Sequence, residues 1–224
     1  MKKLFYILIV LSLIFPFSVS AATYTSQPSA KDAFFWETQP TVNFGSNVNL
    51  WIYCVASGNA RGILNFDVSD LPAGATISSA KLNLNYYSRA VADPVGLSVD
   101  VFKVTRDNWT EAGSTWNKYD GSNDWTAAGG DYVTSNPAGA NVNMPADYGW
   151  IEWEIKDIVE DAIANVSSSV NVIVKFTTEG TGGKDAFLAS NNYTDDTDLR
   201  PKLVIEYTAE EGAGRQLRGQ GIKR

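Results

Sequence analysis

Apolar and polar residues alternate one by one through most of this chain, and the helical period is nearly absent. In the run 81–88, for example, Leu82, Leu84 and Tyr86 fall on one side of an extended backbone. The same alternation marks the runs 47–54, 62–68, 97–101, 151–155, 170–176 and 201–207, with a further short run around Phe187. A two-residue period belongs to half-buried strands, and Gly, Pro, Asn and Asp separate the runs. The pattern predicts an all-β fold, an antiparallel jelly-roll β-sandwich.

The segment 157–166 departs from this alternation and predicts one short helix. Its apolar residues stand at positions 158, 159, 162, 163 and 166. That spacing places them on one helix face, and Asp157 is a suitable N-cap. We expect the helix to pack over one end of the sandwich. Downstream, Pro201 marks the start of the last strand, so we expect the domain to end near residue 208.

The first 22 residues have the composition of an export signal. Lys2 and Lys3 precede an apolar run over 4–15, and small residues follow at 18–22. We expect a signal peptide at 1–22, cleaved after Ala21 or Ala22. The alternative is an uncleaved anchor, but the run is shorter than the roughly 20 residues of a bilayer span. The chain is therefore predicted to be secreted or at the cell surface, without a membrane span after cleavage.

The predicted domain, 23–208, is strongly acidic. The whole chain has a formal charge of −7, and removing Lys2 and Lys3 makes it −9. The Gly-rich tail carries +2 over residues 210–224, which leaves a charge of −11 for the body between. We expect the tail, 209–224, to be flexible. Binding to nucleic acid needs a basic footprint, so we exclude nucleic acid as a partner. Polyanionic glycans are disfavoured unless a local basic patch or a bridging cation intervenes.

The chain offers few residues for catalysis. It has no histidine, and its single cysteine, Cys54, falls on the inward side of a strand, so we expect a buried, inert thiol. The usual histidine-dependent nucleophiles and structural zinc sites therefore lack their residues. We predict that the protein is not an enzyme. Glycoside hydrolysis by two carboxylates is the open alternative, with candidates at Glu111, Asp120, Asp124 and Asp131.

Five groups of motifs, in order along the chain, resemble one family. They are Asp32-Ala33-Phe34 with Asn43-Phe44-Gly45, the run 61–72, the run 74–84, Trp109-Thr110-Glu111 with Thr115-Trp116-Asn117, and Arg200-Pro201-Lys202-Leu203. This set resembles the DNRLRE domain, or disaggregatase-related repeat, a family grouped with carbohydrate-binding modules. The resemblance implies an exported jelly-roll sandwich, of a kind found beside polysaccharide-active enzymes and in surface or matrix proteins. Some members bind polyuronides such as alginate, which the acidic body disfavours here.

The outward positions of the predicted strands carry residue types that bind sugars. The candidate ligand contacts are Trp51, Tyr53, Arg61, Asn65, Asn83, Asn85, Tyr87 and Arg89. Flat rings stack on pyranose C–H faces, and amides and guanidinium groups bind hydroxyls. The alternatives are an ordinary wet sheet face and a face covered by the long polar loop 109–148. That loop offers a second platform at Trp125, Tyr132 and Tyr148, whereas we expect Trp109 and Trp116 to pin it to the body.

Calcium is the ion that the sequence indicates. Its hard oxygen ligands are abundant, and Asp195, Asp196 and Asp198 fall in one turn. Asp32 and Asp185 are secondary candidate ligands, each the second residue in one of the two copies of the tetrapeptide Lys-Asp-Ala-Phe. The alternatives are a solvated acidic loop and carboxylates that cap strand ends. We expect no other cofactor.

Two functions of different classes fit these observations. The first is non-catalytic binding of a polysaccharide or a cell-surface glycan outside the cell. The second is a structural subunit of a surface matrix, adhesin or filament that self-associates through exposed β-edges. A third, an enzyme subdomain whose catalytic partner lies on another chain, has less in its favour. Glycan binding is the function that we predict.

Overall fold

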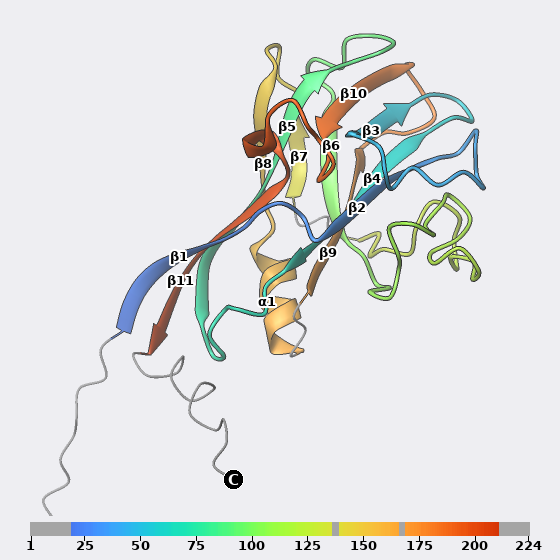
Figure 1. Ribbon diagram of the computed structural model, residues 1–224. Coiled ribbons are helices and arrows are strands. Elements are labelled where there is room, and N and C mark those ends of the chain that lie inside the picture. The colour runs from blue at the N-terminus through green and yellow to red at the C-terminus, as the bar shows by residue number, and fades with distance from the viewer. Residues whose placement is uncertain (1–18, 136–138, 166–168, 211–224) are drawn as a thin grey trace, which may run out of the picture.

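The computed structural model describes residues 19–135, 139–165 and 169–210 (Figure 1). Within these residues the chain forms eleven strands, one α-helix and one 3-10 turn. The strands are β1 (Val19–Ser26), β2 (Lys31–Trp36), β3 (Asn49–Cys54), β4 (Ala60–Asp67), β5 (Thr76–Ser88), β6 (Ser98–Lys103), β7 (Gly139–Asn143), β8 (Gly149–Glu154), β9 (Ser169–Phe176), β10 (Lys184–Ala189) and β11 (Lys202–Glu210). The helix α1 (Lys156–Ala164) follows β8, and the turn η1 (Thr197–Leu199) precedes β11. The prediction of an all-β fold with one short helix is confirmed.

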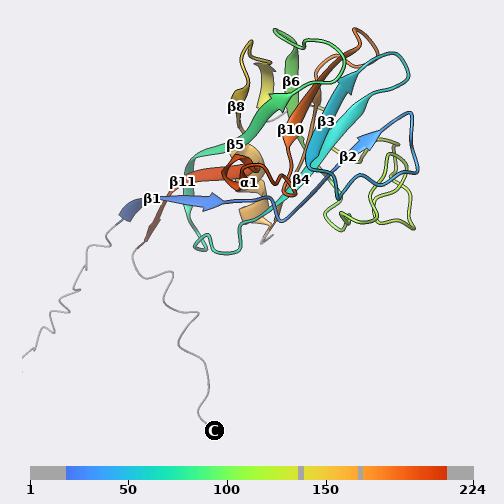
Figure 2. The same ribbon diagram turned by 45° about the horizontal axis from the view of Figure 1, so that its top comes forward.

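The strands form one antiparallel sheet that curls into a two-layer sandwich. Hydrogen bonding follows the path β1-β11-β5-β10-β3-β4-β9-β6-β7, with β8 beside β5 and β2 beside β4. Between β3 and β4 the pairing is reduced to Tyr53 and Ala60, and the path turns there into the other layer. Layer A contains β1, β11, β8, β5, β10 and β3, and layer B contains β2, β4, β9, β6 and β7 (Figure 1 and Figure 2).

The inward faces of the two layers share one hydrophobic core. Leu82 and Leu84 of β5 line it from layer A, and Leu64 and Phe66 of β4 line it from layer B. These are the inward positions that the alternation predicts. Burying one such side chain stabilises the fold by about 1.5–3 kcal/mol relative to leaving it in water. Cys54 is a free, buried thiol in the same core, as predicted.

The helix α1 closes one end of the sandwich, as predicted. Its buried residues Ile158, Val159 and Ala162 join the core, and the helix contacts β5 of layer A and β9 of layer B. The predicted N-cap is wrong: the helix begins at Lys156, and Asp157 lies in its first turn, where a carboxylate still favours the helix dipole. In the described part of the chain, no helix has the length and apolar character of a bilayer span.

Two strands, β1 and β7, give no signal in the sequence, because small and polar residues fill them. β1 pairs with β11 from Val19 opposite Glu210 to Ser26 opposite Leu203. It therefore contains both predicted cleavage points, and a cut after Ala22 would leave the pairs of residues 23–26 in place. β11 also runs past the predicted domain end to Glu210. Residues 1–18 and 211–224, most of the predicted signal peptide and tail, lie outside the described residues.

Candidate functional site

Residues 105–135, here called the covering loop, connect β6 to β7 and fold back over the outer face of layer B (Figure 1). The loop contributes to a second hydrophobic cluster, which contains Trp109, Trp116, Trp125, Phe35, Phe102 and Ile173. The indole Nε1 of Trp109 donates to Asn171 Oδ1 at 2.9 Å, and Asn65 Nδ2 donates to the same oxygen at 2.9 Å. The prediction that Trp109 and Trp116 pin this loop is confirmed.

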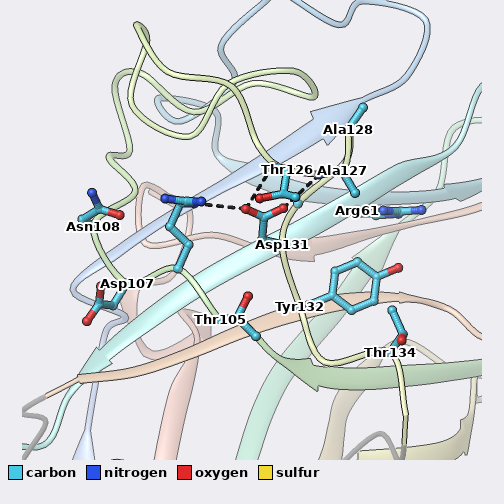
Figure 3. Close-up of a pocket in the computed structure, with 12 residues that line it drawn as sticks. Arg61, Thr105, Asp107, Asn108, Thr126, Ala127, Ala128, Asp131, Tyr132 and Thr134 are labelled. Carbon is cyan, nitrogen blue, oxygen red and sulfur yellow. Dashed lines mark hydrogen bonds and ion pairs between the residues drawn. The ribbon is translucent and has the colours of Figure 1, made fainter.

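A pocket of about 640 Å³, here called the loop pocket, lies where the covering loop meets layer B (Figure 3). Its lining consists of Arg61 of β4 and of the loop residues Thr105, Arg106, Asp107, Asn108, Thr126, Ala127, Ala128, Gly130, Asp131, Tyr132 and Thr134. Pockets of roughly 300–1,000 Å³ are typical of small-molecule sites. The loop pocket therefore has room for a short stretch of glycan.

Asp131 fixes the shape of the pocket wall. Its carboxylate accepts hydrogen bonds from the amides of Thr126 at 3.1 Å and Ala127 at 3.0 Å, and from Arg106 Nε at 3.0 Å (Figure 3). Burial alone would raise the pKa of Asp131, but these hydrogen bonds hold it below its usual value. The ionised carboxylate thus ties together the two parts of the loop that line the pocket.

Arg61 holds the covering loop from the side of the sheet. Its Nε and Nη2 donate to the two carboxylate oxygens of Glu179, each at 2.7 Å, and its Nη1 donates to the carbonyl of Gly129 at 2.9 Å. Burial alone would lower the pKa of Arg61, but the bonds to Glu179 raise it above its usual value. Gly129 has a φ of +87°, and a Cβ there would lie 2.6 Å from Arg61 Nη1. Glycine at this position is what lets the loop approach the guanidinium group.

The remaining lining groups suit a polyhydroxylated ligand. Tyr132 is half-buried, with its ring centroid 5.2 Å from that of Phe102 and 5.5 Å from the Arg61 guanidinium. Burial raises the pKa of the Tyr132 hydroxyl, so it keeps its proton at neutral pH and can donate. Exposed side chains at Thr105, Asn108 and Thr126 add hydroxyl and amide groups. A ring beside positioned donors and acceptors is the combination that sugar sites use.

A second aromatic surface, here called the aromatic face, consists of Trp36, Trp51, Tyr53 and Phe187. Trp51 stacks on Tyr53 with ring centroids 5.0 Å apart, and Trp36 meets it edge-on at 5.1 Å. The indole Nε1 of Trp51 donates to Asp185 Oδ2 at 3.1 Å. Because these rings pack mainly against one another, the aromatic face offers a ligand less ring surface than its composition suggests.

The comparison with known families decides the class of the protein. The sequence profile of carbohydrate-binding module family 96 matches residues 23–207, nearly the whole of the sandwich. The chain belongs to carbohydrate-binding module family 96. The predicted resemblance is thereby confirmed at the level of a carbohydrate-binding module family, and the name DNRLRE stays a prediction. No match was found among curated proteins.

Two of the predicted contact residues of this family 96 module, Asn83 and Asn85, lie on the outer side of β5 but are buried, with 4% and 6% exposed. Longer side chains flank them: Lys202 is opposite Asn83, and Trp150 is opposite Asn85. The Lys202 ammonium lies 4.1 Å from the Trp150 ring centroid, so this pair reaches across β5. The expectation that these amides form an open face is wrong, because they are short side chains between taller neighbours.

Asn65 and Trp125 are also inside the module, with 5% and 4% exposed. Asn65 is covered by the loop and shares Asn171 with Trp109, as described above. Trp125 packs against Phe35 at 5.6 Å and donates to the carbonyl of Thr115 at 2.9 Å. The expectation of exposure is wrong for both, since the covering loop uses them as packing and hydrogen-bonding groups.

The other predicted contacts are separated rather than arranged in one row. Arg61 lines the loop pocket, while Trp51 and Tyr53 belong to the aromatic face. Tyr87 packs against Tyr193 at 4.8 Å. Arg89 forms an ion pair of 3.3 Å with Asp93 and donates to the hydroxyl of Tyr148, which is 54% exposed. Of the predicted contacts on the strands, the structure brings Arg61 into the loop pocket, where it meets Tyr132 of the predicted second platform.

The predicted calcium ligands lie in two different places. Asp195, Asp196 and Asp198 are exposed around η1, where Asp196 Oδ1 accepts from the amide of Asp198 at 2.9 Å. Asp32 is 1% exposed, and burial raises its pKa to about 7. Among the residues that the structure describes, no group of three or more Asp, Glu, Cys or His side chains is arranged to hold a metal. The acidic turn at η1 therefore has the geometry of a capped, solvated loop.

Several lining residues of the pocket had no signal as site residues in the sequence. Arg106, Thr105 and Asn108 lie just after β6, in a stretch without strand or helix period. They reach the pocket because Asp131, some 25 residues along the chain, binds Arg106 across the loop. The sequence feature that indicates a site here is the length of the loop and its many aromatic and polar residues, since such loops are commonly functional.

Proposed function

We propose that this family 96 module binds a polysaccharide in the loop pocket, outside the cell and without breaking a bond. The observation that carries the proposal is the pocket itself: Tyr132 lies beside Arg61, hydroxyl and amide side chains surround them, and Asp131 fixes the wall through Arg106 and two loop amides. A fixed wall lowers the ordering cost of binding. Export follows from the predicted signal peptide.

The carboxylates that sequence analysis offered for hydrolysis have structural partners, which supports binding without catalysis. Asp131 accepts three hydrogen bonds within the covering loop. Asp120 accepts from the amides of Ser122 and Asn123, and Asp124 pairs with Lys118 at 2.9 Å. Glu111 accepts from the amide of Asp32 and from Asn191. Each group holds backbone or a neighbouring side chain, whereas a catalytic pair needs two carboxyls facing one bond.

Affinity electrophoresis in native gels that contain neutral or acidic polysaccharides tests the proposal. We expect at least one glycan to retard the protein, and neutral glycans to do so more than polyuronides at low salt, because the body is acidic. Tyr132→Ala should weaken binding by about tenfold or more, the cost of losing a central aromatic contact. Reducing ends in the glycan should not increase during incubation with the protein.

Tyr53→Ala, on the aromatic face, is the matched control, and we expect it to bind like the parent. Loss of binding in Tyr53→Ala with normal binding in Tyr132→Ala would place the site on the aromatic face instead. No retardation by any glycan, together with polymers in size-exclusion chromatography, would favour the structural subunit that assembles through β-edges.

A further inference from the structure

Two buried aspartates occupy equivalent places at strand starts. Both carboxylate oxygens of one accept hydrogen bonds, whereas only one oxygen of the other does. Asp32 and Asp185 are the second residues of β2 and β10, in the two copies of Lys-Asp-Ala-Phe, and are 1% and 0% exposed. The carboxylate of Asp185 accepts from the amides of residues 90–92 and from Trp51 Nε1. Asp32 accepts through Oδ2 alone, and its Oδ1 is buried without a partner among the described residues.

The hydrogen bonds around Asp32 show which residues surround its carboxylate. Asp32 Oδ2 accepts from Ser29 Oγ at 2.6 Å and from the amide of Asn191 at 2.8 Å. The side chain of Asn191 donates through Nδ2 to Glu111 Oε1 at 2.9 Å, and the amide of Asp32 donates to the same Oε1 at 3.1 Å. Asp32, Glu111 and Asn191 are therefore immediate neighbours, although they come from β2, the covering loop and the segment after β10.

A second buried oxygen in this cluster also lacks a partner. Asn191 Oδ1 is buried and has no hydrogen-bond donor in the described structure. A buried polar atom without a partner costs about 1–3 kcal/mol, so each of these acceptors calls for a donor, a water molecule or a cation. A pair of acceptors without donors is what a cation site presents when only protein atoms are considered.

Two cationic side chains lie near the cluster, and the charge of Arg200 partly offsets the rise that burial causes in the pKa of Asp32, but neither donates a hydrogen bond to the two unpaired oxygens. Lys31 Nζ donates to the carbonyl of Trp109, and Arg200 Nε donates to the carbonyl of Tyr193 at 2.8 Å. Within the described residues, neither Asp32 nor Glu111 forms an ion pair with Lys or Arg (the ion pairs lie elsewhere). Two carboxylates and one amide side chain thus meet in one cluster without a direct ion pair, and a divalent cation would balance their charge.

We propose that Asp32, Glu111 and Asn191 bind one calcium ion through their side-chain oxygens. Calcium takes hard oxygen ligands from carboxylates, amides, backbone carbonyls and water, and tolerates irregular geometry, whereas magnesium needs a near-ideal octahedron. Two carboxylates with an amide oxygen correspond to a site of the weak class found in extracellular modules, with a Kd of about 10⁻⁴–10⁻³ M. This site replaces the exposed turn at Asp195, Asp196 and Asp198 as the calcium candidate.

The ion would join three segments that are distant in sequence. Glu111 belongs to the covering loop, Asp32 begins β2, and Asn191 follows β10, so one ion would tie the loop to the body. Calcium would therefore stabilise the fold without taking part in ligand contact, because the loop pocket is lined by other residues. The inference stands whether or not the loop pocket binds a glycan.

Calorimetric titration of the metal-free protein with CaCl₂, and thermal unfolding in EDTA or in about 10 mM CaCl₂, test the site. We expect one calcium ion per chain and a rise in Tm of roughly 3–10 °C, as a ligand at about 10–100 times its Kd gives for a domain of this size. Asp32→Asn should lose both the heat and the Tm response. It should still fold, because the amide oxygen can keep the hydrogen bonds from Ser29 Oγ and the amide of Asn191.

Glu111→Gln provides a second variant in case Asp32→Asn fails to fold, and it should lower calcium affinity at least tenfold. Asp195→Asn, in the exposed turn at η1, is the matched control and should respond to calcium like the parent. The proposal is overturned if the parent shows neither heat nor a Tm shift, or if Asp32→Asn responds as the parent does. A Tm that depends on pH but not on calcium would also overturn it, by showing a proton shared between the two oxygens.

Discussion

Asp131 is the single residue on which the wall of the loop pocket most depends. It joins Thr126, Ala127 and Arg106 through one carboxylate, and 9% of the residue is exposed. Hydrogen bonds from backbone amides to an ionised carboxylate are roughly twice as strong as neutral ones. The charge of Asp131, and not only its shape, is therefore part of what holds the loop.

This charge gives stability a definite pH dependence. The folded-state pKa of Asp131 lies below its unfolded value of 3.8, so its contribution is present above that pH and is lost as pH falls through the folded pKa. We expect Asp131→Asn to lower the free energy of unfolding by about 2 kcal/mol near neutral pH. Urea titrations at several pH values should show this difference shrinking below about pH 4.

The surface pair Lys118–Asp124 offers the control, because the side chain of Asp124 is 75% exposed. Asp124→Asn should change stability by less than about 1 kcal/mol at any pH. A difference between the parent and Asp131→Asn that stayed constant down to about pH 2 would contradict the role given to the ionised carboxylate.

Among structural elements, the covering loop is the one whose attachment decides whether a pocket exists. Trp109 is fully buried against layer B and donates to Asn171. Trp109→Phe keeps a ring but removes the donor, so we expect a loss of about 1 kcal/mol in the free energy of unfolding. Trp109→Ala also leaves a cavity and should cost about 3–5 kcal/mol. Chemical denaturation measures both.

Glycan affinity separates the contribution of the loop from global stability. Under conditions where both variants remain folded, Trp109→Ala should bind glycan more weakly than Trp109→Phe. If Trp109→Ala bound glycan as well as the parent, attachment of the covering loop would not matter for the pocket.

The strands and the covering loop show why most of the fold can be predicted from the sequence, whereas the site cannot. Strands such as β5 and β9 have one face in the core, so Leu82 and Val172 repeat with the strand period. β7 lacks that repeat, because its residues are Gly, Ala, Asn and Val. A local pattern reports which face of a strand is buried against the core, but not which loop covers the opposite face.

Asn65, Asn83 and Asn85 illustrate that limit. Each points outward on its strand as predicted, yet each is buried, one by Trp109 of a distant loop and two by neighbours from β8 and β11. Their covering groups are dozens of residues away in the chain. The sequence indicates Tyr132 as a platform residue through its aromatic ring alone, since its partner Arg61 lies far away in the chain, on β4.

At the scale of the whole molecule, the two layers have different roles. Layer A and the inward face of layer B form the core, while the outer face of layer B supports the covering loop and the loop pocket. Strands β1 and β7 end the hydrogen-bonded path, and their edges are where self-association would begin. We place ligand binding at the loop pocket, away from both edges.

The most direct test of this placement is an NMR titration of the ¹⁵N-labelled protein with an oligosaccharide from a glycan that retards it. Binding in the loop pocket predicts that amide signals from residues 105–108 and 126–134 shift progressively, while the sugar is recovered intact. Shifts concentrated in β3 and β10, or a sugar that is cleaved during the titration, would contradict it.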